Sequence, residues 1–97
     1  MIIVNQDRDK IINFDNLTQV YITQDEEETA YFIRFETVDS LYDDLGEYET
    51  EERAQEIITE IAQSYLDAEN YKYLNEKMTT EQLNNMQKGL IYEMPEE

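Results

Sequence analysis

Apolar and polar residues alternate with a period of two through the first half of the chain, which is the pattern of β-strands. Two short apolar runs, 1–5 and 11–14, lie on either side of a polar cluster and predict a hairpin. Residues 17–23 and 29–38 alternate in the same way, and both are rich in the β-branched and aromatic residues that favour strands. The pattern therefore predicts a series of short strands in this half of the chain.

The spacing changes to that of a helix near residue 50. Just before the change, a short strand is predicted at 45–48, where Gly46 indicates a bulge or a turn. Thr50 is suited to cap a helix, and the acidic residues that follow it favour the positive end of a helix dipole. Apolar residues then recur three or four positions apart, which predicts a long amphipathic helix at about 51–68. Its apolar stripe consists of Ala54, Ile57, Ile58, Ile61, Ala62, Tyr65 and Leu66.

The last part of the chain carries shorter patterns. Thr79 and Gln82 have the spacing of a capping box, so a short second helix is predicted near 80–88. Residues 90–94 predict a final strand, and no Gly-rich or Pro-rich linker interrupts the sequence. The predicted fold is a single α+β domain over 1–97. An antiparallel sheet of four to six short strands would carry the long helix on one face.

The chain is strongly acidic. Its 24 Asp and Glu residues against seven Lys and Arg residues give a formal net charge of −17, and the excess is spread over both halves. Such a field repels nucleic acids and anionic membranes and attracts basic proteins. The N-terminal apolar run is too short for a signal peptide, and no stretch approaches the ~20 apolar residues of a membrane span. A cytoplasmic protein that binds neither nucleic acid nor membrane directly is therefore expected.

The residues that most often carry catalysis are absent from the sequence. There is no His and no Cys, which removes the usual general base, the usual nucleophile pairs and thiolate zinc sites. The oxygen-rich clusters 25–28 and 43–44 could bind Ca²⁺ or Mg²⁺ weakly, but neither has the spacing of an EF-hand loop. The sequence therefore predicts a protein that is not an enzyme and holds no metal or cofactor.

Four short segments carry a resemblance to known proteins. They are the opening MIIVNQD of 1–7, INFDN of 12–16, the Gly-x-Tyr-x-Thr-Glu-Glu-Arg-Ala run of 46–54, and YEMP of 92–95. Together they resemble small proteins of about this length that are encoded by phages and mobile elements of low-GC Gram-positive bacteria. The resemblance implies no enzyme activity. It implies a genomic setting of phage–host conflict, which includes inhibitors of host defence such as anti-CRISPR proteins.

The size of the charge and the resemblance lead to a functional hypothesis. Solubility of a small domain needs a net charge of magnitude about 2–8, and a larger one destabilises the fold by self-repulsion. A cationic partner would offset that cost. We expect an acidic DNA mimic in the cytoplasm of a bacterial host, which blocks the basic nucleic-acid channel of a Cas nuclease or another nucleic-acid-binding enzyme. The candidate phosphate surrogates are Asp25, Glu26, Glu27, Glu28, Asp43, Asp44, Glu47 and Glu49, with Tyr71 and Tyr73 as flanking apolar anchors.

Two other interpretations stay open at this stage. The protein could be a non-enzymatic structural or oligomeric accessory domain of a phage or host, whose acidic surface serves only solubility. A homodimer that buries the Tyr-rich segment 65–73 would favour that interpretation. A divalent-cation buffer is the third alternative, and it predicts a large rise in melting temperature with Ca²⁺.

Overall fold

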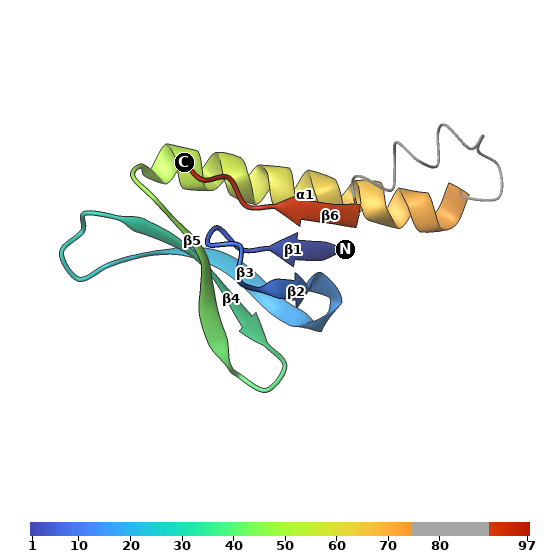
Figure 1. Ribbon diagram of the computed structural model, residues 1–97, viewed down its shortest axis with the longest axis horizontal. Helices are drawn as coiled ribbons and strands as arrows, with labels where there is room; N and C mark the ends of the chain where they lie inside the picture. The colour runs from blue at the N-terminus through green and yellow to red at the C-terminus, as the bar shows by residue number, and fades with distance from the viewer. Residues whose placement is uncertain (75–89) are drawn as a thin grey trace.

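The computed structural model of the chain describes residues 1–74 and 90–97, including all of their side chains except those of residues 71–74. The short helix predicted near 80–88 lies outside the described residues. Within them the fold is α+β, with six strands in two three-stranded sheets and one long helix (Figure 1). The α+β class is confirmed. The prediction of one sheet of four to six strands is wrong.

The smaller sheet joins the two ends of the chain. Its strand order is β2-β1-β6, with β1 at Ile2–Val4, β2 at Ile11–Asn13 and β6 at Ile91–Glu93. The predicted hairpin between β1 and β2 is confirmed, whereas β6 pairs parallel to β1. The expectation of purely antiparallel pairing is wrong because the chain reaches β6 only after a long crossover through the helix, and such a crossover allows parallel neighbours.

The larger sheet is an antiparallel meander. It consists of β3 (Leu17–Gln24), β4 (Tyr31–Thr37) and β5 (Tyr42–Tyr48), and the 3₁₀ turn η1 (Phe14–Asn16) leads into β3. β5 begins earlier than the predicted 45–48, because its first residues are polar and hide the apolar pattern. A register shift pairs Ile33 with Gly46 and Arg34 with Asp44. The predicted irregularity at Gly46 is therefore a bulge.

The helix α1 spans Glu51–Leu74, beyond the predicted end near residue 68. Thr50 caps it as predicted, since the Arg53 backbone N–H donates to Thr50 Oγ1 at 3.1 Å. Ile57 on its inner face is fully buried, whereas Ala62 and Leu66, which the apolar stripe also included, are exposed. With 3.6 residues per turn, Ala62 and Leu66 lie roughly 110° and 150° round the helix from the centre of its buried face. The two sheets do not reach that flank.

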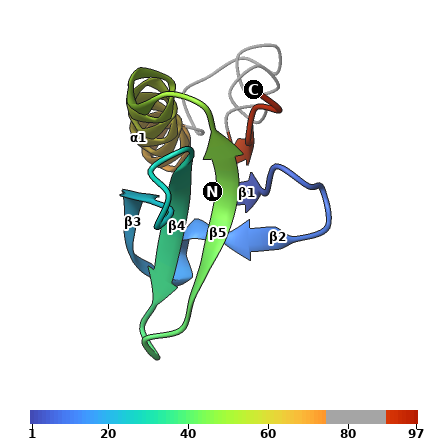
Figure 2. The same cartoon turned by 90° about the vertical axis from the view of Figure 1, so that its left-hand side faces the viewer.

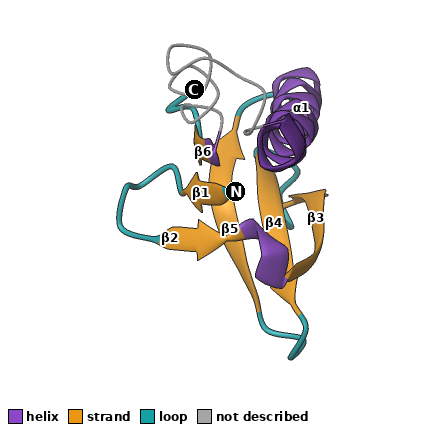
Figure 3. Ribbon diagram, turned by 90° about the vertical axis from the view of Figure 1, so that its right-hand side faces the viewer, coloured by secondary structure: helices purple, strands orange, loops and turns teal. Residues whose placement is uncertain are grey.

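One hydrophobic core connects the helix with both sheets. The helix packs against β3, β4, β5 and β6, and the smaller sheet lies beside β5, so that β3 forms the opposite rim (Figures 2 and 3). The largest fully buried side chains are those of Ile3, Ile33, Leu45, Ile57 and Met94. They come from β1, β4, β5, α1 and the segment after β6, so the end of the chain completes the core.

Candidate protein-binding surface

The turn between β3 and β4 presents the first acidic cluster. Asp25 organises the turn, because its carboxylate accepts hydrogen bonds from Thr29 Oγ1 at 2.7 Å and from the Thr29 and Ala30 backbone N–H groups at 2.8 and 3.3 Å. The hydrogen bond from the Thr29 hydroxyl lowers the pKa of Asp25. Residues 26–28 are exposed at the tip, and none of them takes part in an ion pair among the described residues. The tip therefore consists of a structural carboxylate and three free ones.

The two aspartates of β5 meet cations within the chain. Asp43 forms an ion pair with Lys10, and the hydrogen bond from Lys10 lowers the pKa of Asp43. Asp44 accepts from Arg34 Nε at 2.8 Å, and the Arg34 guanidinium also lies 4.9 Å from the ring centroid of Tyr42. Both aspartates lie on β5, in the part that the predicted strand at 45–48 did not include. Their charges are partly compensated, so they contribute less to the field around the molecule than the free glutamates of the tip.

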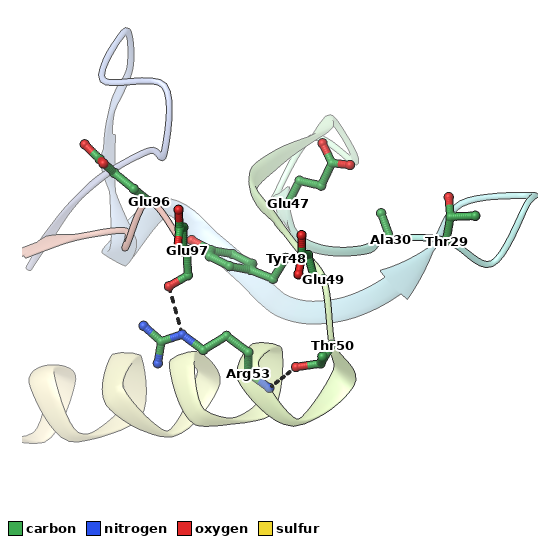
Figure 4. Close-up of a pocket in the computed structure, with 9 residues that line it drawn as sticks. All are labelled: Thr29, Ala30, Glu47, Tyr48, Glu49, Thr50, Arg53, Glu96 and Glu97. Atoms are coloured by element: carbon green, nitrogen blue, oxygen red, sulfur yellow. Dashed lines mark hydrogen bonds between the residues drawn. The ribbon is translucent and has the colours of Figure 1, made fainter.

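The last part of β5 forms one wall of a groove (Figure 4). The groove has a volume of about 700 Å³ and lies where the β3–β4 turn, the start of α1 and the end of the chain approach one another. Its lining residues are Thr29, Ala30, Glu47, Tyr48, Glu49, Thr50, Arg53, Glu96 and Glu97. Four carboxylates and one guanidinium therefore share the groove, and the two predicted residues Glu47 and Glu49 belong to it.

The single cation of the groove is already occupied. Arg53 Nε donates to the Glu97 carbonyl at 3.0 Å, and Arg53 Nη1 lies 3.0 Å from Glu56 Oε2 and 3.9 Å from Glu60 Oε1 (Figure 4 shows the first contact). The described ion pairs include neither Glu47 nor Glu49. The positive charge thus holds the helix and the chain end together, and the groove keeps an excess of negative charge.

Tyr48 closes the groove from the core side. It is 3% exposed, and its hydroxyl donates to the Pro95 carbonyl at 2.7 Å. Burial raises the pKa of Tyr48 to about 12, so the hydroxyl stays protonated at neutral pH. Gly46 leaves the space for the Tyr48 side chain, because a Cβ atom at this position would come within 2.8 Å of the Tyr48 hydroxyl oxygen. Tyr48 is therefore a structural link between β5 and the end of the chain.

Gln6, in the turn after β1, fixes the groove wall from the other side. Its backbone N–H donates to the Leu45 carbonyl at 2.8 Å, and its side-chain oxygen accepts from the Glu47 N–H at 2.7 Å. Its side-chain nitrogen lies 3.0, 3.3 and 2.8 Å from the carbonyl oxygens of Glu47, Pro95 and Glu96. Nothing in the sequence indicates this role, because a polar residue in a turn does not reveal partners that lie about 40 and 90 positions away.

A second hollow continues the acidic surface on the other side of β5. It has a volume of about 290 Å³, and Glu47 belongs to both hollows. The turn between β1 and β2 contributes Asp7 and Asp9, which the sequence analysis did not select. Negative side chains therefore extend along both sides of β5, with Lys10 as the cation that interrupts them on this side.

Tyr71 and Tyr73 lie in the last turns of α1, but their side chains are outside the described residues. In the part of the chain that the structure describes, no three Asp, Glu, His or Cys side chains gather as they would around a metal ion. Neither α1 nor another helix in that part has the length and apolar character needed to cross a membrane. Comparison with protein-family models, curated proteins and solved structures finds no match to this chain.

Proposed function

We propose that this protein is a non-catalytic, acidic inhibitor from a phage or mobile element. It would bind the basic nucleic-acid channel of a host defence protein such as a Cas nuclease, where its carboxylates replace phosphates. The contact surface would be the β3–β4 tip together with the wall of the large groove. The residues assigned to direct contact with cations of the partner are Glu26, Glu27, Glu28, Glu47 and Glu49.

The observation that carries this proposal is the division between compensated and free carboxylates. The charges of Asp43 and Asp44 are partly compensated by cations of the same chain, and the Asp25 carboxylate is hydrogen-bonded within the turn. The glutamates of the tip and of the groove wall are exposed and have no ion pair among the described residues, and the turn that carries the tip reaches the groove through Thr29 and Ala30. Like charges that stay close together without compensation destabilise a small fold. A cationic surface on a partner would remove that repulsion.

The geometry of the tip suits insertion into a channel. The β3–β4 turn projects from the body of the molecule (Figure 1), and Asp25 fixes its backbone from within. A turn that is ordered before binding loses less conformational entropy when it is docked. The Debye length at physiological ionic strength is about 8 Å, so carboxylates within that distance of one another would act on an approaching cationic surface as one field.

The experiment compares two variants of equal net charge. In the first, Glu26→Gln and Glu27→Gln neutralise the tip, and in the second, Asp39→Asn and Glu93→Gln neutralise exposed carboxylates elsewhere. Each protein is titrated into guide-loaded Cas nucleases of Gram-positive bacteria, and DNA binding and cleavage are measured between about 0.05 and 0.3 M salt. We expect inhibition that weakens with salt. Association should be slower for the tip variant and close to wild type for the control, because exposed charges act mainly on the association rate.

Two results would contradict the proposal. One is binding that does not change with salt, since phosphate-like contacts to a basic channel must be screened. The other is an equal loss of association in the tip variant and the control variant, which would assign the effect to total charge instead of to this surface. Absence of inhibition in every nuclease tested would remove the Cas nuclease as the target.

A further inference from the structure

β3 forms the rim of the larger sheet opposite β5, and its lack of charged residues is unusual for this chain. Residues 16–24 are the longest run without Asp, Glu, Lys or Arg in the whole sequence, and they contain all of β3. No residue of this eight-residue strand is buried. Among the described strands, β3 has β4 as its only neighbour (Figure 2). Its outer edge is therefore long and uncharged, and it pairs with no strand in the part of the chain that the structure describes.

The other edges of the two sheets are shorter or already occupied. The outer edge of β5 is held by Gln6, whose backbone and side chain bind Leu45 and Glu47. The edge strands of the smaller sheet, β2 and β6, have three residues each. Proteins usually protect a long edge strand with charges, prolines or bulges, since its free N–H and C=O groups can pair with another chain. β3 has a single irregularity, near its start between Leu17 and Gln19.

We propose that β3 pairs with β3 of a second copy of this chain, antiparallel and around a two-fold axis at Tyr21. This register places Val20 opposite Ile22 of the partner copy and Gln19 opposite Thr23, and each pair occurs twice. Apolar β-branched residues therefore meet on one side of the strand and polar residues on the other, which is the complementarity that stabilises antiparallel pairs. The two larger sheets become one continuous sheet of six strands.

The distribution of charge favours a second copy of this chain as the partner that pairs with the edge of β3. Two molecules of net charge −17 repel each other, so self-association requires a contact without carboxylates. β3 itself carries no charged residue, and the Glu36 carboxylate of β4 accepts a hydrogen bond from the Gln19 side chain. Just beyond the strand, the same register brings Glu27 near Asp15 of the other copy, and this like-charge contact favours dissociation at low salt. Self-association should therefore become stronger as salt rises, the reverse of binding to a basic partner.

The test measures the mass of the full chain in solution by sedimentation equilibrium over a range of salt and protein concentration. We expect a monomer of 11.7 kDa at low salt and an increasing share of a species of twice that mass as salt rises. The double variant Gln19→Glu with Thr23→Glu places like charges opposite each other twice and should weaken dimerisation about tenfold. The double variant Gln19→Lys with Thr23→Glu creates two opposite-charge pairs in this register and should restore the dimer.

A control variant separates the effect of charge on β3 from the effect of added charge elsewhere on the protein. Gln55→Glu with Gln63→Glu adds the same two charges on exposed positions of α1 and should dimerise close to wild type. A protein that stays monomeric at every salt concentration would overturn the proposal, as would a dimer that the like-charge variant leaves unchanged or that the opposite-charge variant fails to restore. A monomer that still inhibits a nuclease refutes the pairing alone, and a dimer without an inhibited target refutes the proposed function alone.

Discussion

The side chain of Gln6 provides the most informative test of the fold, because it ties the groove wall to the end of the chain. Gln6→Ala removes the bond from the Glu47 N–H and the bonds from Nε2 to the carbonyls around it. Nε2 has two hydrogens for three carbonyl oxygens, so about three hydrogen bonds are lost in total. Each contributes about 0.5–1.5 kcal/mol net, and water can replace some of these exposed bonds. We expect a loss of about 2 kcal/mol in the free energy of unfolding.

The isosteric change Gln6→Glu separates hydrogen bonding from size. The carboxylate can still accept from the Glu47 N–H, but it faces carbonyl oxygens to which the amide donated. We therefore expect Gln6→Glu to be less stable than Gln6→Ala at pH 7. As the pH falls through the range of carboxyl pKa values, the glutamate at this position becomes protonated and can donate again, so its deficit relative to Gln6→Ala should shrink.

Urea unfolding followed by far-UV circular dichroism measures these differences. A domain of this size loses about 4–8 °C in melting temperature per kcal/mol, so Gln6→Ala should melt roughly 8–16 °C lower. Gln63→Ala is the matched control, since the described hydrogen bond of this exposed side chain goes to the Asp67 carboxylate on the same helix, and the variant should stay within about 0.5 kcal/mol of wild type. A Gln6→Ala protein as stable as this control would refute the account of Gln6 as a link between strand and chain end.

Three further changes test other parts of the structure. Thr50→Ala removes the helix cap and should cost about 1 kcal/mol in urea unfolding, whereas Thr50→Ser should be nearly neutral; equal losses in both would contradict the cap. Tyr48→Phe removes the bond to Pro95 and should cost about 1 kcal/mol at neutral pH. The pKa of Tyr48 in the folded protein is raised to about 12, so wild type should lose stability as the pH rises from 10 towards 12. This loss should exceed that of Tyr48→Phe by about 2–3 kcal/mol. Parallel pH profiles of the two proteins would exclude ionisation of Tyr48 as the cause. Ile57→Val, at a fully buried position of the helix, should cost about 0.5–1.5 kcal/mol with an unchanged urea slope, and an unaltered midpoint would place Ile57 outside the core.

The local elements of this fold were predictable because each leaves a periodic trace. The β1–β2 hairpin, the strands β3 and β4 and the start of α1 follow from apolar spacing and from the cap at Thr50. The beginning of β5 escaped prediction because its residues Tyr42 to Asp44 are exposed or half-buried, and a strand without a buried face shows no alternation. The division into two sheets was also not predicted, since an alternation with a period of two identifies a strand but does not show which other strand pairs with it.

The sequence by itself determined the total charge of the molecule, the absence of His and Cys, and the position of the acidic clusters along the chain. Only the tertiary structure decided which carboxylates remain free. Lys10 and Arg34 pair with Asp43 and Asp44 across 33 and 10 positions of sequence, and Glu96 and Glu97 join Glu47 in one groove although about 50 residues separate them. Electrostatic interaction depends on distance in space, whereas composition gives only the number of charges.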